Sequence, residues 1–240
     1  MEEKTITSFE SLQNEFRQFI FSRNYIYRGV NNATYQLIPK IGRKIYLDKL
    51  DPKLDINDAL LNLENDLWDS FVKMSIPFEN LRDLSPWESL ATAQHYGIPT
   101  RYLDWSQNPL VATYFSIENA KSDSAIYITD STQFNANVLD FEDPFSITDD
   151  IMLYRPPYIN QRIIAQKGLF TVHKMPNIPL ENINIHDKPI MITKLILKYE
   201  CHEEILKILN SYGINRSFIY PGLDGLATYL DFKAQRGWDI

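Results

Sequence analysis

Polar and aromatic side chains are concentrated in residues 85–115, between two segments with clear helix signals. Those able to contact a ligand are Gln94, His95, Tyr96, Arg101, Asp104, Trp105, Ser106 and Asn108. A packed core does not require so many amide, imidazole, guanidinium and carboxylate groups, since such groups are seldom buried. Binding residues are common on short connections held by rigid elements, so we expect a ligand site here.

The two helices that flank this site have readable ends. Ser85, Pro86 and Glu88 form a capping-box sequence with proline at the first helical position, which predicts a helix beginning at about residue 86. Gly97 supplies the left-handed residue that ends this helix. Pro109 begins the second helix in the same way as Pro86 begins the first. The residues between them are then a short strand and a turn.

Hydrophobic periodicity and turn residues predict the other elements. The predicted helices cover about residues 8–22, 56–74, 203–212 and 223–232, and the predicted strands 25–30, 125–129, 162–173, 190–198 and 217–220. Thr7 and Glu10 should cap the first helix, and helix 56–74 should lie mostly in the core. About residues 131–160 have the composition of an irregular insertion. Because helices and strands are mixed and the second half is strand-rich, we expect one α+β domain over residues 1–240.

Composition limits the classes of protein that this chain can be. It has 240 residues, 44% of them hydrophobic, which is enough for a full core. A formal net charge of −7 argues against nonspecific coating of nucleic acid or anionic membrane. Cys201 is the only cysteine, which excludes a disulfide within the chain. The first residues lack the apolar segment of a secretory signal. No apolar run reaches the roughly 18 residues of a membrane span. We expect a cytoplasmic protein with no membrane partner.

Several familiar chemistries lack their residues. The four histidines, His95, His173, His186 and His202, and the single Cys201 do not have the spacing of a zinc site, so no metal is expected. A P-loop, a dinucleotide-binding glycine turn and a hydrolase nucleophile elbow are all missing from the sequence. The acidic cluster that two-metal nucleases need is not evident either.

Five motifs occur in the order expected of a known family. They are YRGV at 27–30, LIPKIGR at 37–43, AQHYGIPTRYLDWSQNPLVATYF at 93–115, RIIAQKGLF at 162–170 and YPGLDGLATYL at 220–230. The chain resembles the FRG domain family over nearly its whole length. The resemblance implies a protein of bacterial or phage type, in settings that include defence and toxin systems.

The layout also resembles the arginine, serine and glutamate arrangement of ADP-ribosyltransferases, and this implies a related fold. The corresponding positions are Arg28, Ser106 and Gln166, which the resemblance makes the catalytic candidates with NAD as substrate. Arg28 would hold phosphate or ribose through its planar fork, Ser106 would position the sugar, and Gln166 would contact its hydroxyls. The candidates for other NAD contacts are Tyr27, His95, Tyr96, Arg101, Asp104 and Trp105. The sequence departs from the pattern at Gly168, where the family's carboxylate is expected.

Each of these residues also has a structural interpretation. Arg28 could pair with Asp104 in a buried ion pair that fixes strand register. Arg101 could be the Asp104 partner instead, or could cap the preceding helix. Asn108, directly before Pro109, is interpreted as the cap of the helix that begins there, and Ser106 could belong to the same cap region.

Two functions therefore remain open. The first is an ADP-ribosyltransferase-like enzyme that transfers ADP-ribose from NAD to a protein, a nucleic acid or water, as a toxin or defence effector. The second is a non-catalytic FRG module that binds a ligand or a protein. The two are separated first by geometry, since the enzyme requires Arg28, Ser106 and Gln166 around one cleft that is open to solvent.

Overall fold

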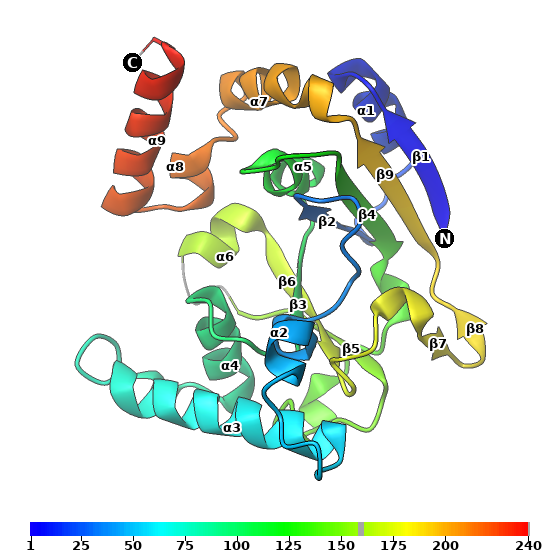
Figure 1. Cartoon of the computed structure of the whole chain (residues 1–240), viewed down its shortest axis with the longest axis vertical. Coiled ribbons are helices and arrows are strands. Elements are labelled where there is room, and N and C mark those ends of the chain that lie inside the picture. The colour runs from blue at the N-terminus through cyan, green and yellow to red at the C-terminus, as the bar shows by residue number, and fades with distance from the viewer. Residues whose placement is uncertain (158–160, 240) are drawn as a thin grey trace.

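A mixed β-sheet forms the centre of the protein in the computed structural model, which describes residues 1–157 and 161–239 (Figure 1). Within the described residues the sheet has seven strands in the order β1-β9-β4-β2-β3-β6-β5. In that order they are β1 (Glu2–Ile6), β9 (Ile192–Leu197), β4 (Ser124–Asp130), β2 (Tyr25–Val30), β3 (Tyr102–Ser106), β6 (Gly168–His173) and β5 (Ile151–Tyr154). The β1 and β9 strands are parallel and the other neighbours are antiparallel. A separate hairpin consists of β7 (Asn184–Ile185) and β8 (Lys188–Pro189).

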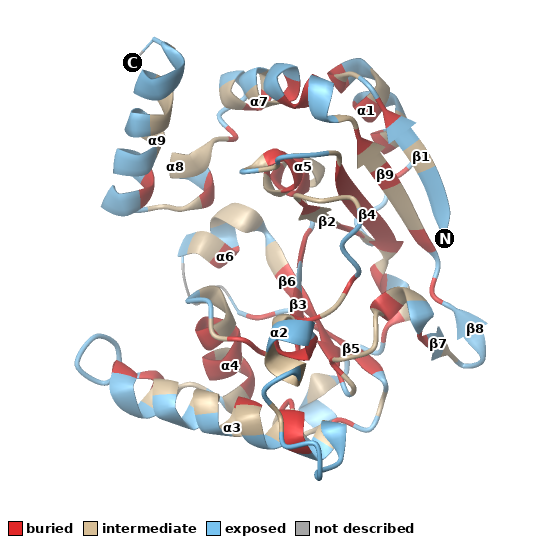
Figure 2. Cartoon of the chain, in the orientation of Figure 1, coloured by how far each residue is buried: buried red, intermediate tan, exposed pale blue. Residues whose placement is uncertain are grey.

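Helices surround this sheet, so the expected α+β class is confirmed. They are α1 (Phe9–Phe16), α2 (Lys44–Leu47), α3 (Ile56–Ser75), α4 (Pro86–His95), α5 (Pro109–Ile117), α6 (Gln161–Gln166), α7 (His202–Ser211), α8 (Arg216–Ile219) and α9 (Leu223–Arg236). Buried side chains of α1, α5 and α7 pack with β2, β4 and β9 in one core. A second cluster joins α4 to β3, β5 and β6. Burial is accordingly greatest in the central strands and on the inner sides of these helices (Figure 2).

The helices on either side of the predicted site have the predicted ends. The Ser85 hydroxyl accepts a hydrogen bond from the Glu88 amide at 3.3 Å, and the Glu88 carboxylate accepts one from the Ser85 amide at 2.9 Å. Gly97 has a φ of 90° just after α4. The Asn108 side chain caps α5 by accepting from the Leu110 amide at 3.0 Å. Strand β3 lies between the two helices, so this part of the prediction is confirmed.

Gly29 sets the distance between β2 and helix α5. A Cβ atom at Gly29 would lie 1.9 Å from the Ala112 carbonyl oxygen and 2.6 Å from the Ser116 amide nitrogen, both in the backbone of α5. Only glycine permits two backbones to approach this closely. The glycine of the YRGV motif is therefore the residue that lets α5 pack directly on β2.

The N-terminal elements differ from the prediction. The first helix ends at Phe16 instead of about residue 22, and turns follow it as Phe19 folds back into the core at 8% exposure. Its capping box is formed by Ser8 and Ser11, because the Ser11 hydroxyl accepts from the Ser8 amide at 3.1 Å. Strand β1 was not predicted, since its sequence EEKTI has the charge of a solvent-exposed edge.

The long helix and the expected insertion also need correction. Helix α3 has the predicted extent, but its only buried hydrophobic residues are Ala59 and Leu60, while Met74 is 73% exposed. It therefore lies at the periphery of the core. Residues 131–157 are not wholly irregular, because Ile151–Tyr154 form the edge strand β5. Residues 158–160 of the expected insertion lie outside the described residues.

Two predicted strands are wholly or partly helical. Residues Gln161–Gln166 form α6, and strand β6 begins only at Gly168. Lys167 separates them with a φ of 45°, a left-handed conformation that ends the helix. The predicted strand at 217–220 is helix α8, since the Asn215 side chain caps it by accepting from the Phe218 amide at 3.2 Å.

Candidate functional site

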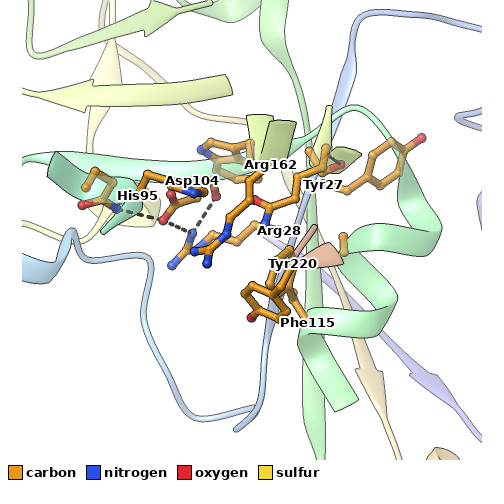
Figure 3. A pocket seen from close by; sticks show the side chains of 13 residues that line it. Tyr27, Arg28, His95, Asp104, Phe115, Arg162 and Tyr220 are labelled. Carbon is orange, nitrogen blue, oxygen red and sulfur yellow. Dashed lines mark hydrogen bonds and ion pairs between the residues drawn. The ribbon is translucent and has the colours of Figure 1, made fainter. Parts of the chain in front are cut away.

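The central sheet is weakly joined between β2 and β3, and the candidate site lies at this junction. These strands pair only at Tyr27 and Ser106, whereas β2 pairs with β4 through six positions. A pocket of about 260 Å³ lies here. Its walls come from β2, β3, α4, α5 and α6 and from Tyr220, which follows α8 (Figure 3). Side chains from five elements and a loop thus converge where the ladder is interrupted.

Arg28 extends from β2 across this junction. Its Nη1 donates to the Asp104 carbonyl oxygen at 2.6 Å and approaches Asp104 Oδ2 at 3.4 Å. Arg28 and Asp104 therefore pair, but the pair is not buried as expected, because the Asp104 side chain is 55% exposed. The Arg28 side chain is only 14% exposed, and its Nε has no hydrogen-bond partner among the described residues. Burial lowers the pKa of Arg28 and Asp104 opposes that shift, yet a guanidinium stays protonated in proteins. Arg28 is therefore a half-buried cation in which only Nη1 has hydrogen-bond partners among the described residues.

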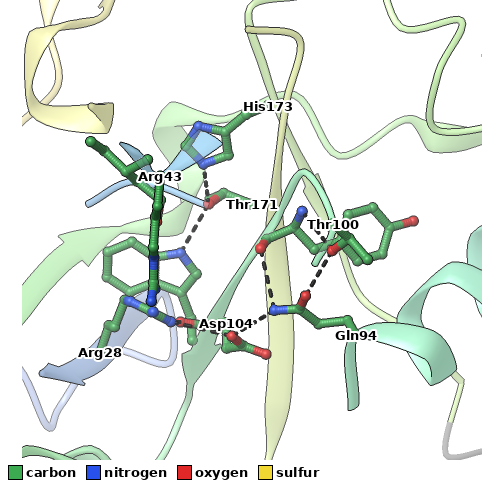
Figure 4. Close-up of polar contacts among 10 residues, drawn as sticks. Arg28, Arg43, Gln94, Thr100, Asp104, Thr171 and His173 are labelled. Atoms are coloured by element: carbon green, nitrogen blue, oxygen red, sulfur yellow. Dashed lines mark hydrogen bonds and ion pairs between the residues drawn. The ribbon is translucent and has the colours of Figure 1, made fainter. Parts of the chain in front are cut away.

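Asp104 faces the same pocket and is held by an amide network (Figure 4). Gln94 Nε2 donates to Asp104 Oδ2 at 2.9 Å and to the Tyr102 carbonyl at 3.3 Å. The Thr100 hydroxyl donates to Gln94 Oε1 at 2.7 Å, which fixes the orientation of the amide. Gln94 therefore positions the carboxylate of Asp104.

Ser106 and Gln166 line the pocket together with Arg28, so the three proposed catalytic positions are brought together. Both side chains also connect elements. The Ser106 hydroxyl donates to the Gln166 carbonyl at 2.6 Å and accepts from the Asn108 amide at 2.9 Å. Gln166 Nε2 donates to the Ile219 carbonyl at 3.1 Å. Ser106, which is 4% exposed, therefore ties β3 to α6 and to the cap of α5.

Arg162 and Tyr220 line the pocket and were not singled out from the sequence. The Arg162 guanidinium lies 5.4 Å from the centre of the Tyr220 ring, and Arg216 lies 4.9 Å from it. The Tyr220 hydroxyl donates to Glu118 Oε2 at 3.0 Å. Both residues fall within the motifs at 162–170 and 220–230. Those motifs were the available signal, but predicting residues 162–173 and 217–220 as strands hid how Arg162 and Tyr220 meet.

The remaining predicted ligand contacts divide into residues at the pocket and residues away from it. Tyr27, His95 and Trp105 line it, although Tyr27 and Trp105 are 2% and 3% exposed. Burial, assisted by the charge of Arg162, lowers the pKa of His95 to about 4, so its imidazole is neutral at pH 7. Tyr96 does not line the pocket and is 62% exposed.

Arg101 lies outside the pocket and has neither of its predicted structural partners. Its Nε donates to Glu64 Oε2 at 2.8 Å and its amide donates to Glu64 Oε1 at 2.6 Å. The guanidinium also lies 4.9 Å from the centre of the Phe145 ring. The Glu64 side chain, on α3, is 0% exposed, and a buried carboxylate requires a charged partner. Arg101 is therefore sealed in an ion pair that attaches α3 to the start of β3.

The charge of the pocket suits an anion. Arg28 and Arg162 contribute two positive charges, and among the described residues that line it Asp104 contributes the only carboxylate. No group of histidine, cysteine and acidic side chains within residues 1–157 and 161–239 is arranged to hold a metal ion. No helix in the same described parts is both long and apolar enough to span a bilayer.

Comparison with known proteins identifies one family. The model of the FRG domain matches residues 23–125. This range contains β2, α4, β3 and α5, and so includes Arg28, Gln94, Asp104 and Ser106. Arg162, Gln166 and Tyr220 complete the pocket from beyond the matched range. No curated protein and no solved structure matches the chain.

Proposed function

We propose that the pocket of this chain, whose residues 23–125 match the FRG domain, binds an NAD-like dinucleotide and that the protein transfers ADP-ribose from it. The supporting observation is the pair of guanidinium groups, Arg28 and Arg162, which reach one pocket from different elements. Guanidinium forks match the oxygen geometry of phosphates. Arg28 is the stronger candidate for the pyrophosphate, since only Nη1 of its guanidinium has hydrogen-bond partners among the described residues and its Nη2 has none.

The walls of the pocket support a ligand that also has rings. Phe115 and Tyr220 lie to one side of the two arginines, and His95 lies to the other beside Asp104 (Figure 3). Aromatic faces stack on flat heterocycles, and a neutral imidazole can hydrogen-bond to ribose hydroxyls. A volume of about 260 Å³ is small for a whole dinucleotide. The pocket would therefore hold the pyrophosphate and the reacting ribose, with the rest of the ligand over the surface.

The residue roles differ in part from those that the resemblance implies. Ser106 would act on the ligand indirectly, because its hydroxyl is already used by Gln166 and Asn108. Gln166 uses one N–H of its Nε2 on the Ile219 carbonyl, and its Oε1 is left to accept from a ribose hydroxyl. The acceptor of ADP-ribose would be a protein or nucleic acid, as for a toxin or defence effector, or water.

A non-catalytic binding module is the second candidate function. Gly168 gives it specific support, because the carboxylate expected at that position is missing. As a binding module, the protein would bind the nucleotide with the same arginines and aromatic rings, and the bond between nicotinamide and ribose would not be cleaved.

Ligand-dependent thermal stability tests the proposal. Saturation with NAD or ADP-ribose should raise the melting temperature of the wild-type protein, since a ligand at 100 times its Kd adds about 2.7 kcal/mol of stability. Arg28→Ala and Arg162→Ala should each weaken binding about tenfold or more, the loss expected for a charge-assisted hydrogen bond. Nicotinamide release, measured in parallel, separates the enzyme from the binding module.

Two controls make this test specific. Arg82→Ala removes an exposed arginine far from the pocket lining and should leave affinity unchanged. Arg162 has no ion pair or hydrogen bond among the described residues, so its removal should not disturb the fold. Wild-type protein that binds neither nucleotide, or an Arg162→Ala variant that binds as tightly as wild type, would contradict the proposal.

A further inference from the structure

The glycosidic bond of NAD breaks through a transition state with positive charge on the ribose, and a nearby carboxylate stabilises such a state. At the position where the resemblance expects that acid, the chain has Gly168. Among the described residues, no Asp or Glu close to Gly168 in the sequence lines the pocket instead. Glu118 lies behind Tyr220 and is not part of the lining, and its oxygens already accept from Tyr114, Arg216 and Tyr220. One carboxylate remains among the described lining residues.

We propose that this carboxylate, Asp104, is the catalytic carboxylate of the pocket, supplied from β3 in place of the one missing at Gly168, and that it acts as the ionised group that stabilises the ribose cation and accepts a proton. The inference rests on the proposed NAD-dependent function. It assigns the chemistry to a residue that the sequence alone suggested only as a ligand contact or as a partner of Arg28.

The contacts of Asp104 leave one of its oxygens available. Gln94 and Arg28 both approach Oδ2, at 2.9 and 3.4 Å. Oδ1 accepts no hydrogen bond from the described residues, and the side chain is 55% exposed although it lines a pocket. Here one oxygen is anchored and the other is open to a ligand.

The anchoring also suits the proposed reaction. Gln94 is held by the Thr100 hydroxyl, so the carboxylate is oriented before a ligand arrives. Arg28 contacts Asp104 and lines the same pocket, which would place the anionic part of NAD on Arg28 and its ribose near Oδ1. Negative charge at this point would stabilise the ribose as it becomes cationic.

The step balances with water as the second substrate. The bond between ribose C1′ and the nicotinamide nitrogen breaks, and both electrons go to that nitrogen, so nicotinamide leaves neutral. The oxygen of water bonds to C1′, and its proton passes to Asp104 and then to solvent. The products are ADP-ribose, nicotinamide and one proton, and a hydroxyl of a macromolecule can replace water in the same step.

Asp104→Asn tests this role because asparagine keeps the size of the side chain and an oxygen acceptor for Gln94. Nicotinamide release from NAD should fall at least about 100-fold, the usual contribution of a positioned acid or base. The Kd for ADP-ribose, measured by calorimetry, should change by less than about threefold, since binding depends on Arg28 and Arg162. Asp69→Asn is the matched control, because it neutralises an aspartate that is paired with Lys73 on α3, outside the pocket.

Each outcome decides between distinct ideas. Retained ADP-ribose binding with lost nicotinamide release in Asp104→Asn, and neither change in Asp69→Asn, supports Asp104. Wild-type-like release by Asp104→Asn overturns the role of Asp104 and leaves the proposed function standing. Wild-type protein that binds nucleotide without releasing nicotinamide overturns the catalytic role and favours the binding module. Wild-type protein that binds neither NAD nor ADP-ribose overturns both proposals.

Discussion

His173 is fully buried on β6, and only one nitrogen of its imidazole has a partner within the described residues. Nε2 lies 3.0 Å from the Thr171 hydroxyl, which also accepts from Trp105 Nε1 at 3.0 Å (Figure 4). Burial, with smaller effects from Arg28 and Arg101, lowers the pKa of His173 to about 3. The imidazole is therefore neutral wherever the protein is folded near neutral pH.

This shift predicts how stability depends on pH. The unfolded chain binds a proton at His173 below its ordinary pKa of about 6.5, and the folded protein does so only near pH 3. The contribution of the neutral His173 imidazole to the free energy of unfolding is complete above pH 6.5 and is lost as the pH falls towards 3. The free energy of unfolding then falls by at most about 1.4 kcal/mol per pH unit. Urea unfolding of wild type and His173→Gln at pH 7, 6 and 5 should give a shallower decline for the variant. Parallel declines would contradict this assignment, since His95 and His202 titrate in both proteins.

The contact between β2 and α5 shows how one backbone position affects the site. Gly29 follows Arg28 directly, so the close packing of α5 on Gly29 fixes the strand from which the arginine extends. Any Cβ at Gly29 would collide with backbone atoms of α5, which cannot move aside as a flexible side chain can.

Gly29→Ala is therefore expected to destabilise the protein by about 1–3 kcal/mol, as overpacking of a core does. It should also weaken nucleotide binding, because the shift between β2 and α5 moves Arg28. Gly168→Ala is the matched control in β6, where among the described residues a Cβ would meet only Ile163 atoms at 3.9 Å and φ is not left-handed. Thermal unfolding of both variants measures the difference. Equal melting temperatures of the two variants would show that α5 can move away from β2 without destabilising the protein.

The pocket is a property of the whole chain, since segments nearly 200 residues apart meet in it. Arg28 comes from β2 and Tyr220 from the connection between α8 and α9. Glu118 at the end of α5 holds Tyr220 through its hydroxyl, and Gln166 holds α8 through the Ile219 carbonyl. The C-terminal helices are thereby attached to the FRG-matched part of the chain at the site itself.

Tyr220→Ala should weaken binding of NAD or ADP-ribose by about tenfold, because an aromatic contact contributes on the order of 1 kcal/mol. Tyr220→Phe keeps the ring and loses only the hydrogen bond to Glu118, so its affinity should stay within about threefold of wild type. Calorimetric titration of the two variants tests this. If both bind as wild type does, the ring of Tyr220 is not part of the ligand site.

Local signals accounted for much of the fold around the site. The caps of α4 and α5 and the strand β2 have the predicted positions, because Ser85, Pro86, Asn108 and Pro109 act on neighbouring backbone groups. The predicted secondary structure was wrong where a short segment fits both the strand pattern and the helix pattern. The alternation of residues 162–166 resembles a strand, but these residues form α6, which packs near α8 and ends at Lys167.

The sequence by itself determined the residue types available for chemistry and the helix ends beside β3, because both depend on interactions within a few residues. Only the tertiary structure decided which charges meet. It sealed Arg101 against Glu64 and paired Arg28 with Asp104. It also brought Arg162 and Tyr220 into the pocket that Arg28 lines. Those contacts join residues far apart in the chain, so they are set by how the sheet and helices pack. Burial forces a charged partner only on Arg101 and Glu64, because Asp104 is 55% exposed.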